Sequence, residues 1–234
     1  MRKLIIFTMG GKGGVGKTAF MVNLAEYFEF NNIPKTLVDC DIENKQRGSL
    51  SHYFPEAIKI NIRNPDGLDI FLDATEKVNS PVVIADLGAG SGFDLIHWFK
   101  EMFPIAQKYG INFLAVGSIT SNPGSMETVF TWANELQNKV KYLIVKNYFQ
   151  GEPRLWLDSK DAEKFRRSFR PYEIEFETRM QNLQTELEDH GLSLTAAMNS
   201  TQPEFRKFSV RCRLECCRNQ IFKELDRCRK IIVP

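Results

Sequence analysis

The sequence predicts an α/β protein in which a mainly parallel sheet lies between two layers of helices. Short apolar segments alternate with segments of helical periodicity through the first two thirds of the chain. Apolar strands separated by helices indicate a parallel sheet that is covered on both faces. Because such crossovers are right-handed, the pattern predicts a doubly wound three-layer sandwich. We expect one domain over residues 1–234, since no repeat, low-complexity tract or linker divides the chain.

Strands and helices are expected in alternation along most of the chain. Strands are expected at residues 4–9, 36–40, 58–62, 81–85, 112–116, 140–145 and 172–176. Helices are expected at residues 18–30, 67–74, 93–109, 125–138, 160–170, 180–189 and 204–230. The strand at 81–85 is a continuous apolar run, and the one at 58–62 alternates with a period of two. The helix at 18–30 has apolar side chains at spacings of three and four, as does the long helix that closes the chain.

Composition and charge limit the classes of function that fit the chain. The formal net charge of +2 is too small for a globally basic nucleic-acid binder, so any basic surface must be local. Five cysteines, an odd number without regular spacing, form no disulfide framework and favour a reducing cytoplasm. The apolar run at residues 4–7 is shorter than the roughly 7–15 residues of a signal peptide, and no run approaches the ~18 residues of a membrane span. We therefore expect a soluble, cytoplasmic protein without stable membrane insertion.

A glycine-rich segment follows the first predicted strand and precedes the first predicted helix. Residues 11–18 read Gly-Lys-Gly-Gly-Val-Gly-Lys-Thr and match the G-x-x-x-x-G-K-[ST] pattern of a phosphate-binding loop. Glycine lets backbone N–H groups turn toward phosphate, and the helix that follows adds its positive N-terminal end. The expected nucleotide contacts are Gly11, Gly13, Gly14, Val15, Gly16, Lys17 and Thr18. Lys17 would bind the β- and γ-phosphates and the Thr18 hydroxyl would bind Mg²⁺; the alternative is a glycine-rich turn without a ligand.

The segment from Lys12 to Thr18 resembles the deviant Walker A loop of the ParA/MinD family, which includes nitrogenase iron protein and arsenite-pump ATPases. The mark of that family is a second lysine near the start of the loop, here Lys12. The resemblance implies a P-loop NTPase fold, with ATP and Mg²⁺ as cofactors. It also implies that Lys12 reaches across an ATP-dependent homodimer to the partner's nucleotide. A second cation can stabilise charge on the transferred phosphoryl group, so Lys12 and Lys17 are both expected to be catalytic.

Two carboxylates at the end of the second predicted strand match the first switch segment of that family. Asp39 and Asp41 stand in Val-Asp-Cys-Asp, and residues i and i+2 of a strand share one side. The resemblance implies that Asp39 supports the metal site and that Asp41 orients the attacking water. The chain then departs from many partition ATPases, because Ile42-Glu43-Asn44 follows in place of Pro-Gln-Gly-Asn.

A third segment resembles the Walker B and second switch region. The apolar strand at 81–85 leads into Asp86 and then into Gly88 and Gly90. We expect Asp86 to hold the metal through water, and Gly88 or Gly90 to present a backbone N–H to the γ-phosphate. Many strands end in Asp-x-Gly, so this segment alone is a weak indication. It becomes informative because it follows the other two segments in the order found in the family.

Asn147 follows the predicted strand at 140–145, where relatives place an asparagine that reads adenine. The alternative is a turn asparagine, since this residue is common in turns. Adenine is favoured over guanine partly because the sequence contains neither Asn-Lys-x-Asp nor Thr-Lys-x-Asp.

Cysteines and basic residues gather on the last predicted helix. Its apolar stripe is Val210, Leu214, Cys217, Ile221, Leu225 and Cys228, so we expect thiols that pack a helix face, with a metal site as the alternative. Cys40 is expected on the face opposite the two switch acids.

The basic residues of the last predicted helix would form either a solvated helix face or a surface for DNA. The DNA contacts expected from this helix and the one at 160–170 are Arg166, Arg167, Arg211, Arg213 and Arg218.

The resemblance implies an ATP-binding and ATP-hydrolysing dimerisation switch with slow, partner-stimulated turnover. Segments 191–194 and 211–226 look more like the plasmid branch, with TraL- and StbB-like proteins of conjugative transfer and plasmid stability. Expected partners are non-specific DNA and a plasmid or conjugation protein. One alternative is a metal-cluster or metal-insertion ATPase, in which cysteines are expected soon after the second switch. A MinD-like membrane-positioned switch is another, and a small-molecule kinase is a distant fourth hypothesis that Lys12 disfavours.

Overall fold

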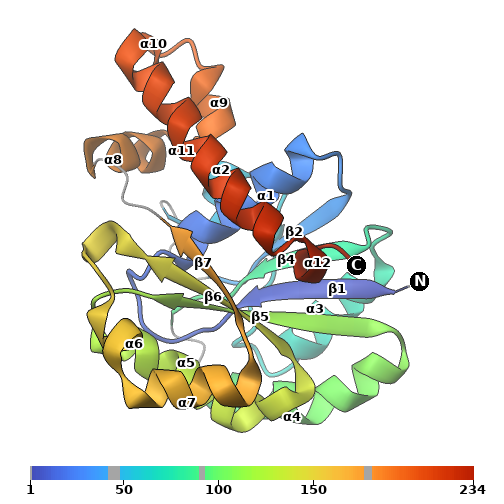
Figure 1. Cartoon of the computed structure of the whole chain (residues 1–234). Helices are drawn as coiled ribbons and strands as arrows, with labels where there is room; N and C mark the ends of the chain where they lie inside the picture. The colour runs from blue at the N-terminus through green and yellow to red at the C-terminus, as the bar shows by residue number, and fades with distance from the viewer. Residues whose placement is uncertain (1, 42–47, 90–92, 177–180) are drawn as a thin grey trace.

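The computed structural model describes residues 2–41, 48–89, 93–176 and 181–234, and its strands form one seven-stranded sheet (Figure 1). The strands are β1 (Lys3–Thr8), β2 (Lys35–Asp39), β3 (Ile58–Lys59), β4 (Val82–Asp86), β5 (Ile111–Ile119), β6 (Lys141–Asn147) and β7 (Tyr172–Phe176). Their order is β3-β2-β4-β1-β5-β6-β7, and every pairing is parallel. The doubly wound parallel sheet predicted from the sequence is confirmed.

Helices cover both faces of the sheet. One face carries α1 (Lys17–Phe30), α2 (Leu50–Tyr53), α8 (Gln181–His190), α9 (Leu194–Met198), α10 (Pro203–Arg206), α11 (Phe208–Arg227) and α12 (Arg229–Ile232). The other face carries α3 (Gly67–Lys77), α4 (Phe93–Lys108), α5 (Pro123–Leu136), α6 (Arg154–Asp158) and α7 (Lys160–Phe169). Two 3₁₀ turns, η1 (Gln137–Lys139) and η2 (Tyr148–Gln150), border β6.

The central strand β1 shows why these residues form a buried parallel strand. All six of its residues are buried. Successive side chains point to opposite faces of a strand, so Leu4 and Ile6 enter the core under α1 and α11, whereas Ile5 and Phe7 enter the core under α4 and α5. A period-two polar pattern is therefore missing, because neither face of this strand meets water.

The last predicted helix is divided into three. The chain leaves α10 at Lys207, whose φ of −60° and ψ of 130° are extended, and it breaks again at Cys228 before α12. In Figure 1, α9, α10 and the first part of α11 project beyond the sheet and its other helices. Side-chain periodicity runs through such short breaks, so the pattern at 204–230 predicted one continuous helix. The predicted strand at 58–62 is also shorter, since only Ile58 and Lys59 pair with β2.

The C-terminal helices are joined to α1, the helix that follows the phosphate-binding loop. Glu26 is buried on α1, and its carboxylate accepts backbone hydrogen bonds from Leu194 and Thr195 at the start of α9. The Tyr27 hydroxyl donates to Asp226 Oδ1 at 2.5 Å and accepts from Arg229 Nη1 at 2.9 Å. A carboxylate at a helix N-terminus satisfies free N–H groups, so these contacts fix the C-terminal helices to the loop helix.

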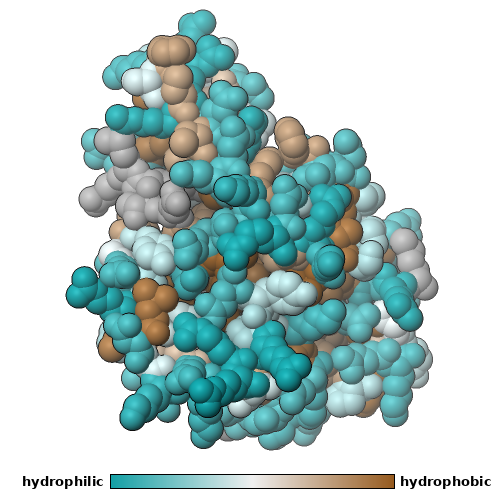
Figure 2. Space-filling model, viewed as in Figure 1, coloured by the Kyte–Doolittle hydropathy of each residue, from teal (hydrophilic) through white to brown (hydrophobic). Residues whose placement is uncertain are grey.

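No helix within the described ranges is long and apolar enough to cross a membrane. The side of the molecule in Figure 2 is mostly hydrophilic, with apolar residues scattered singly or in small groups.

Candidate nucleotide-binding site

The glycine-rich loop joins the carboxyl end of β1 to α1. Gly14 and Gly16 have φ of 72° and 87°, in the left-handed region that glycine adopts at little cost. Gly16 is also a point of close approach, because a Cβ there would clash with the side-chain nitrogen of Asn147. The loop therefore needs glycine at position 16 for both its backbone conformation and its contact with β6.

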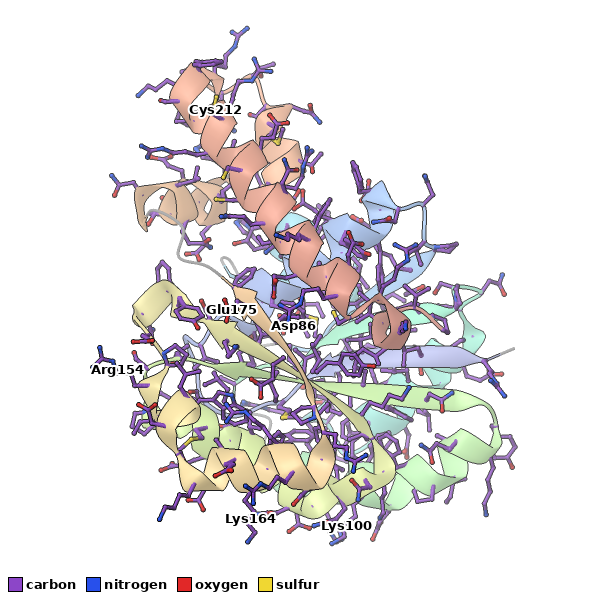
Figure 3. All side chains as sticks on the ribbon, in the orientation of Figure 1. Asp86, Lys100, Arg154, Lys164, Glu175 and Cys212 are labelled. Atoms are coloured by element: carbon purple, nitrogen blue, oxygen red, sulfur yellow. The ribbon has the colours of Figure 1, made fainter. Side chains whose placement is uncertain are left out.

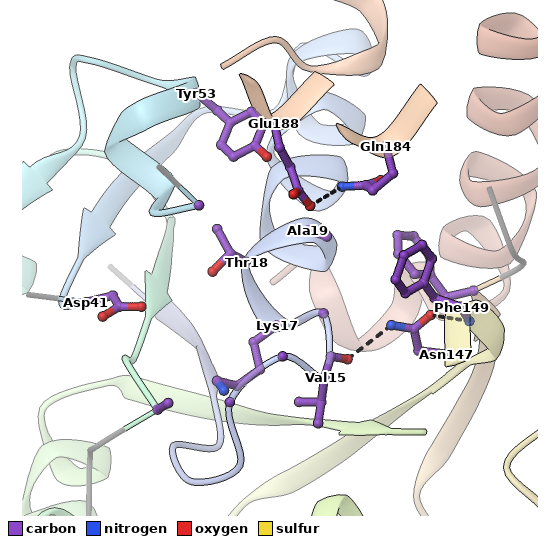
Figure 4. A pocket seen from close by; sticks show the side chains of 16 residues that line it. Val15, Lys17, Thr18, Ala19, Asp41, Tyr53, Asn147, Phe149, Gln184 and Glu188 are labelled. Carbon is purple, nitrogen blue, oxygen red and sulfur yellow. Dashed lines mark hydrogen bonds between the residues drawn. The ribbon is translucent and has the colours of Figure 1, made fainter. Parts of the chain in front are cut away.

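A cavity opens over this loop and brings together residues that are distant in the sequence. The loop and α1 supply its floor, and Figure 4 shows Asp41 on one side with Asn147 and Phe149 on the other. Gln184 and Glu188 of α8 border the cavity above Ala19 in that view. The lining residues are Gly13, Gly14, Val15, Gly16, Lys17, Thr18, Ala19, Asp41, Gly48, Tyr53, Ala89, Asn147, Phe149, Phe176, Gln184 and Glu188. Backbone donors, one lysine and aromatic side chains in one cavity suit a ligand with a phosphate end and a ring end.

The two lysines of the loop have different surroundings. Lys17 is buried to 8% exposure, and its Nζ donates to the backbone oxygen of Lys12 at 2.9 Å. Lys12 is exposed at the outer side of the loop. The Lys17 ammonium is thus held inside the loop, where phosphate oxygens can take the place of a backbone carbonyl as its acceptor.

Asp39 of the predicted first switch lies beside Asp86 of the predicted second switch. Asp39 and Asp86 are register partners on adjacent parallel strands. Both Asp39 carboxylate oxygens accept backbone hydrogen bonds, from Asp41 at 3.0 Å and from Ser51 at 2.9 Å. These bonds join the end of β2 to the first turn of α2, so Asp39 has a structural role. Its predicted support of the metal site would act from this position.

Asp41 lies against the second switch. A Cβ on Gly88 would come within 2.7 Å of Asp41 Oδ1, so only glycine lets this carboxylate approach the backbone there. Ala89 follows and faces Gly13 of the loop. The predicted water-orienting acid and the predicted γ-phosphate donor are therefore neighbours. Gly90 and residues 42–44 lie outside the described residues.

Asp86 is a buried carboxylate with an unused oxygen. It is 1% exposed, and Oδ1 accepts a hydrogen bond from the Thr8 hydroxyl at 3.1 Å. Its Oδ2 is buried and has no hydrogen-bond partner among the described residues. Burial raises the pKa of Asp86 to about 7, and the charge of Asp39 raises it further, whereas the Thr18 hydroxyl and Lys17 lower it. An orphaned buried carboxylate oxygen close to a hydroxyl fits the donor set of Mg²⁺, which prefers oxygen ligands.

Asn147 connects the loop to β6. Its Nδ2 donates to the backbone oxygen of Val15 at 3.0 Å, and its Oδ1 accepts from the backbone N–H of Phe149 at 3.0 Å. Asn147 therefore forms the turn that the alternative hypothesis predicted. It also contacts the phosphate-binding loop. Adenine recognition by Asn147 stays a prediction.

Several site residues had no signal in the sequence. Tyr53, Phe176, Gln184 and Glu188 reach the cavity because α2, β7 and α8 pack around α1, and Phe149 reaches it from η2 after β6. Gln184 Nε2 donates to Glu188 Oε1 at 2.7 Å, so these two side chains are aligned on one face of α8. The spacing of four on a predicted helix was the one sequence feature that could have paired them.

The cysteines do not all pack as expected. Cys228 and Cys40 are buried and Cys217 is partly buried, whereas Cys212 and Cys216 are exposed. Figure 3 shows Cys212 on the projecting part of α11, away from Asp86. The prediction of packed thiols is wrong for these two, because they lie off the apolar stripe on the side of α11 that faces outward. Among the described residues, the potential metal ligands that lie together are Glu186, His190 and Glu204, a group without cysteine.

Two of the arginines expected to contact DNA are half-buried and contact other side chains of the protein. Arg166 Nε donates to Glu173 Oε1 at 2.7 Å, and its guanidinium lies 5.0 Å from the Trp156 ring centroid. Arg218 lies over the Phe30 ring at 5.7 Å, with a buried Nε. These contacts would compete with DNA for both guanidinium groups. Arg167 pairs with Glu163 on the surface, and Arg211 is exposed on α11.

A parallel sheet with this loop and these acids defines a P-loop nucleotide-binding protein. Residues 6–202 match the CobQ/CobB/MinD/ParA nucleotide binding domain family. The match spans most of the chain, and the protein therefore belongs to this family. The ParA/MinD resemblance is confirmed at this level. No curated protein sequence matches the chain.

Solved structures share the fold at low sequence identity. The ParA family ATPase from Chlorobium tepidum TLS has a TM-score of 0.56 and 14% identity over 95% of this chain and 96% of that chain. A chain of the MinC:MinD cell division protein complex from Aquifex aeolicus has a TM-score of 0.55 and 14% identity over 99% and 98%. The signal recognition particle receptor FtsY from Elizabethkingia anophelis has a TM-score of 0.51 and 19% identity over 82% and 66%. These comparisons confirm the fold class and do not bear on the plasmid branch.

Proposed function

We propose that the protein is an ATP-driven dimerisation switch of the ParA/MinD type. It binds ATP, forms a homodimer and resets by slow hydrolysis that a partner stimulates. The observation that carries this proposal is the contrast between the buried Lys17 and the exposed Lys12 at the two ends of one loop. This arrangement suits one lysine that serves the chain's own nucleotide and a second that serves the nucleotide of another copy.

The described residues support a division of roles in hydrolysis. The loop N–H groups and Lys17 bind the phosphates, and Thr18 and Asp86 would hold Mg²⁺, which neutralises phosphate charge when it is bound. Asp41 accepts a hydrogen bond from the attacking water and so orients it. Gly88 lies beside that carboxylate, and its backbone N–H donates to the γ-phosphate. Lys12 of the second copy stabilises the charge that develops in the transition state.

The exposed surface favours non-specific binding to DNA. Arg206, Lys207 and Arg211 are exposed around the projecting junction of α10 and α11. A dimer would present this group twice, which doubles the number of phosphates that can be neutralised. The setting is plasmid partition, stability or conjugative transfer, with a plasmid or conjugation protein as a further partner. The sequence likeness of residues 191–194 and 211–226 to that branch supports it.

Two alanine variants test the proposal. Lys17→Ala should abolish ATP binding, because the phosphates lose the lysine inside the loop. Lys12→Ala should leave ATP affinity within about twofold and weaken ATP-dependent dimerisation and turnover, since its ammonium acts on the other copy. Titration with a fluorescent ATP analogue, light scattering and phosphate release measure the three properties. Equal loss of ATP affinity in both variants would contradict the division of roles.

A further inference from the structure

The start of the phosphate-binding loop is held by one face of α5. Trp132 is 1% exposed, and its Nε1 donates to the backbone oxygen of Gly10 at 2.8 Å. One turn earlier on the same helix, Thr128 Oγ1 accepts a hydrogen bond from the backbone N–H of Lys12 at 3.3 Å. Residues four apart lie on one face of a helix, so α5 holds the loop at two adjacent points.

Thr128 also determines how closely the loop approaches α5. A Cβ on Gly11 would come within 2.7 Å of Thr128 Cγ2 and 2.8 Å of its Oγ1. Gly11 has a φ of 142°, which glycine tolerates and other residues rarely adopt. The loop backbone therefore lies directly on the Thr128 side chain, and both its hydroxyl and its methyl group are in contact.

The direction of the Thr128 hydroxyl is also determined. Its proton goes to the backbone oxygen of Gly124 at 2.8 Å, which leaves the oxygen to accept from Lys12. The Lys12 stem runs along the same turn of α5, since a Cβ on Gly124 would lie 3.5 Å from Lys12 Cδ and 3.8 Å from its Cγ. Both the backbone and the side-chain stem of Lys12 thus contact the first turns of α5.

We propose that Thr128 is a positioning residue that sets the conformation of Gly11 and Lys12, and through them the direction in which the Lys12 ammonium leaves the monomer. An exposed lysine has many rotamers, and ordering such a side chain costs free energy. A backbone held by a rigid helix narrows the positions that the ammonium can reach. The role of Lys12 in the dimer belongs to the proposed function, and this inference rests on it.

A merely structural threonine is the competing explanation. Threonine hydroxyls on helices often bond to the i−4 carbonyl, and Thr128 makes that bond. The chain offers a matched control, because Thr131 on the exposed side of α5 makes the same bond to Glu127 at 2.9 Å. If helix back-bonding were the whole role of Thr128, valine at either position would have the same consequences.

The experiment compares Thr128→Val, Thr128→Ser and Thr131→Val in the full chain. Valine keeps the shape and removes the hydroxyl, and one lost hydrogen bond of 0.5–1.5 kcal/mol corresponds to about 2–12-fold. We expect Thr128→Val to lower kcat and ATP-dependent dimerisation by about 3–10-fold, with ATP affinity within about twofold. Thr128→Ser should recover most of this loss, and Thr131→Val should match the unchanged protein. Hydrogen exchange at the Lys12 amide should accelerate in Thr128→Val alone.

A double variant separates this inference from the proposed function. If Thr128 acts through Lys12, adding Thr128→Val to Lys12→Ala should cause no further loss of dimerisation. Additive losses, equal effects of valine at 128 and 131, or unchanged Lys12 amide exchange in Thr128→Val would overturn the positioning role. A Lys12→Ala protein that dimerises and turns over normally would instead overturn the dimer role of Lys12, and this inference with it.

Discussion

Replacing the buried Asp86 should stabilise the nucleotide-free protein more at alkaline than at acidic pH. Burial raises the pKa of this carboxyl to about 7 from an ordinary value of 3.8. The folded state therefore holds the proton more tightly than the unfolded state does. Stability falls as the pH rises from about 4 to about 7, because folding increasingly requires either uptake of a proton or burial of a charge.

The magnitude follows from the two pKa values. One pKa unit corresponds to 1.36 kcal/mol, so the raised pKa of Asp86 lowers stability by about 4 kcal/mol at pH 8 and about 3 kcal/mol at pH 6, taking the values of 7 and 3.8. Asparagine keeps the shape without the charge. The advantage of Asp86→Asn over the unchanged protein should thus grow by about 1 kcal/mol between pH 6 and pH 8. For a chain of this length, that is roughly 2–4 °C in Tm.

Urea unfolding at pH 6 and pH 8, without nucleotide and with a chelator, measures this difference. The control is Asp73→Asn on the exposed side of α3, which removes a carboxylate without removing a buried charge. A stability difference between Asp86→Asn and the unchanged protein that does not vary with pH would refute the reasoning. Added ATP and Mg²⁺ should stabilise the unchanged protein more than Asp86→Asn, because the phosphate loop is intact in both and only the carboxylate that would hold Mg²⁺ is lost.

Three further predictions address the switch, the DNA surface and the cysteines. Asp41→Ala should slow phosphate release by at least about tenfold and leave a persistent ATP-bound dimer in light scattering, since the phosphate loop is untouched; normal turnover would move the water-orienting role elsewhere. Charge reversal of Arg206 and Arg211 should weaken retardation of any duplex about equally and leave dimerisation unchanged, with binding that is stronger with ATP than with ADP and steeply salt-dependent. No retardation at low salt with ATP would exclude direct DNA binding. Purified protein should be colourless and keep its ATPase activity with a chelator that spares Mg²⁺, whereas stoichiometric iron or zinc on Cys212 or Cys216 would favour a metal-insertion ATPase.

Local sequence determined the fold class and the core of the site. The phosphate-binding loop is eight consecutive residues whose conformation depends on glycine and on the adjoining strand and helix, so its position could be read directly. The family resemblance assigned Asp39 and Asp86 to one metal site, and the register shows them as partners at the edge of the sheet where the ends of parallel strands meet.

Tertiary structure decided what surrounds that loop. Thr128 and Trp132 contact Gly10–Lys12 across more than 100 residues, and no periodicity links a helix face to a loop so distant in the chain. The backbone leaves the helical conformation at Lys207 and Cys228, and the apolar stripe from Val210 to Cys228 marks neither break. Helical periodicity indicates which side of a helix is apolar. It does not indicate which neighbour that side packs against, because the hydrophobic effect is non-directional. For that reason the sequence determined the phosphate end of the site, and only packing determined the wall formed by α8 and the support given by α5.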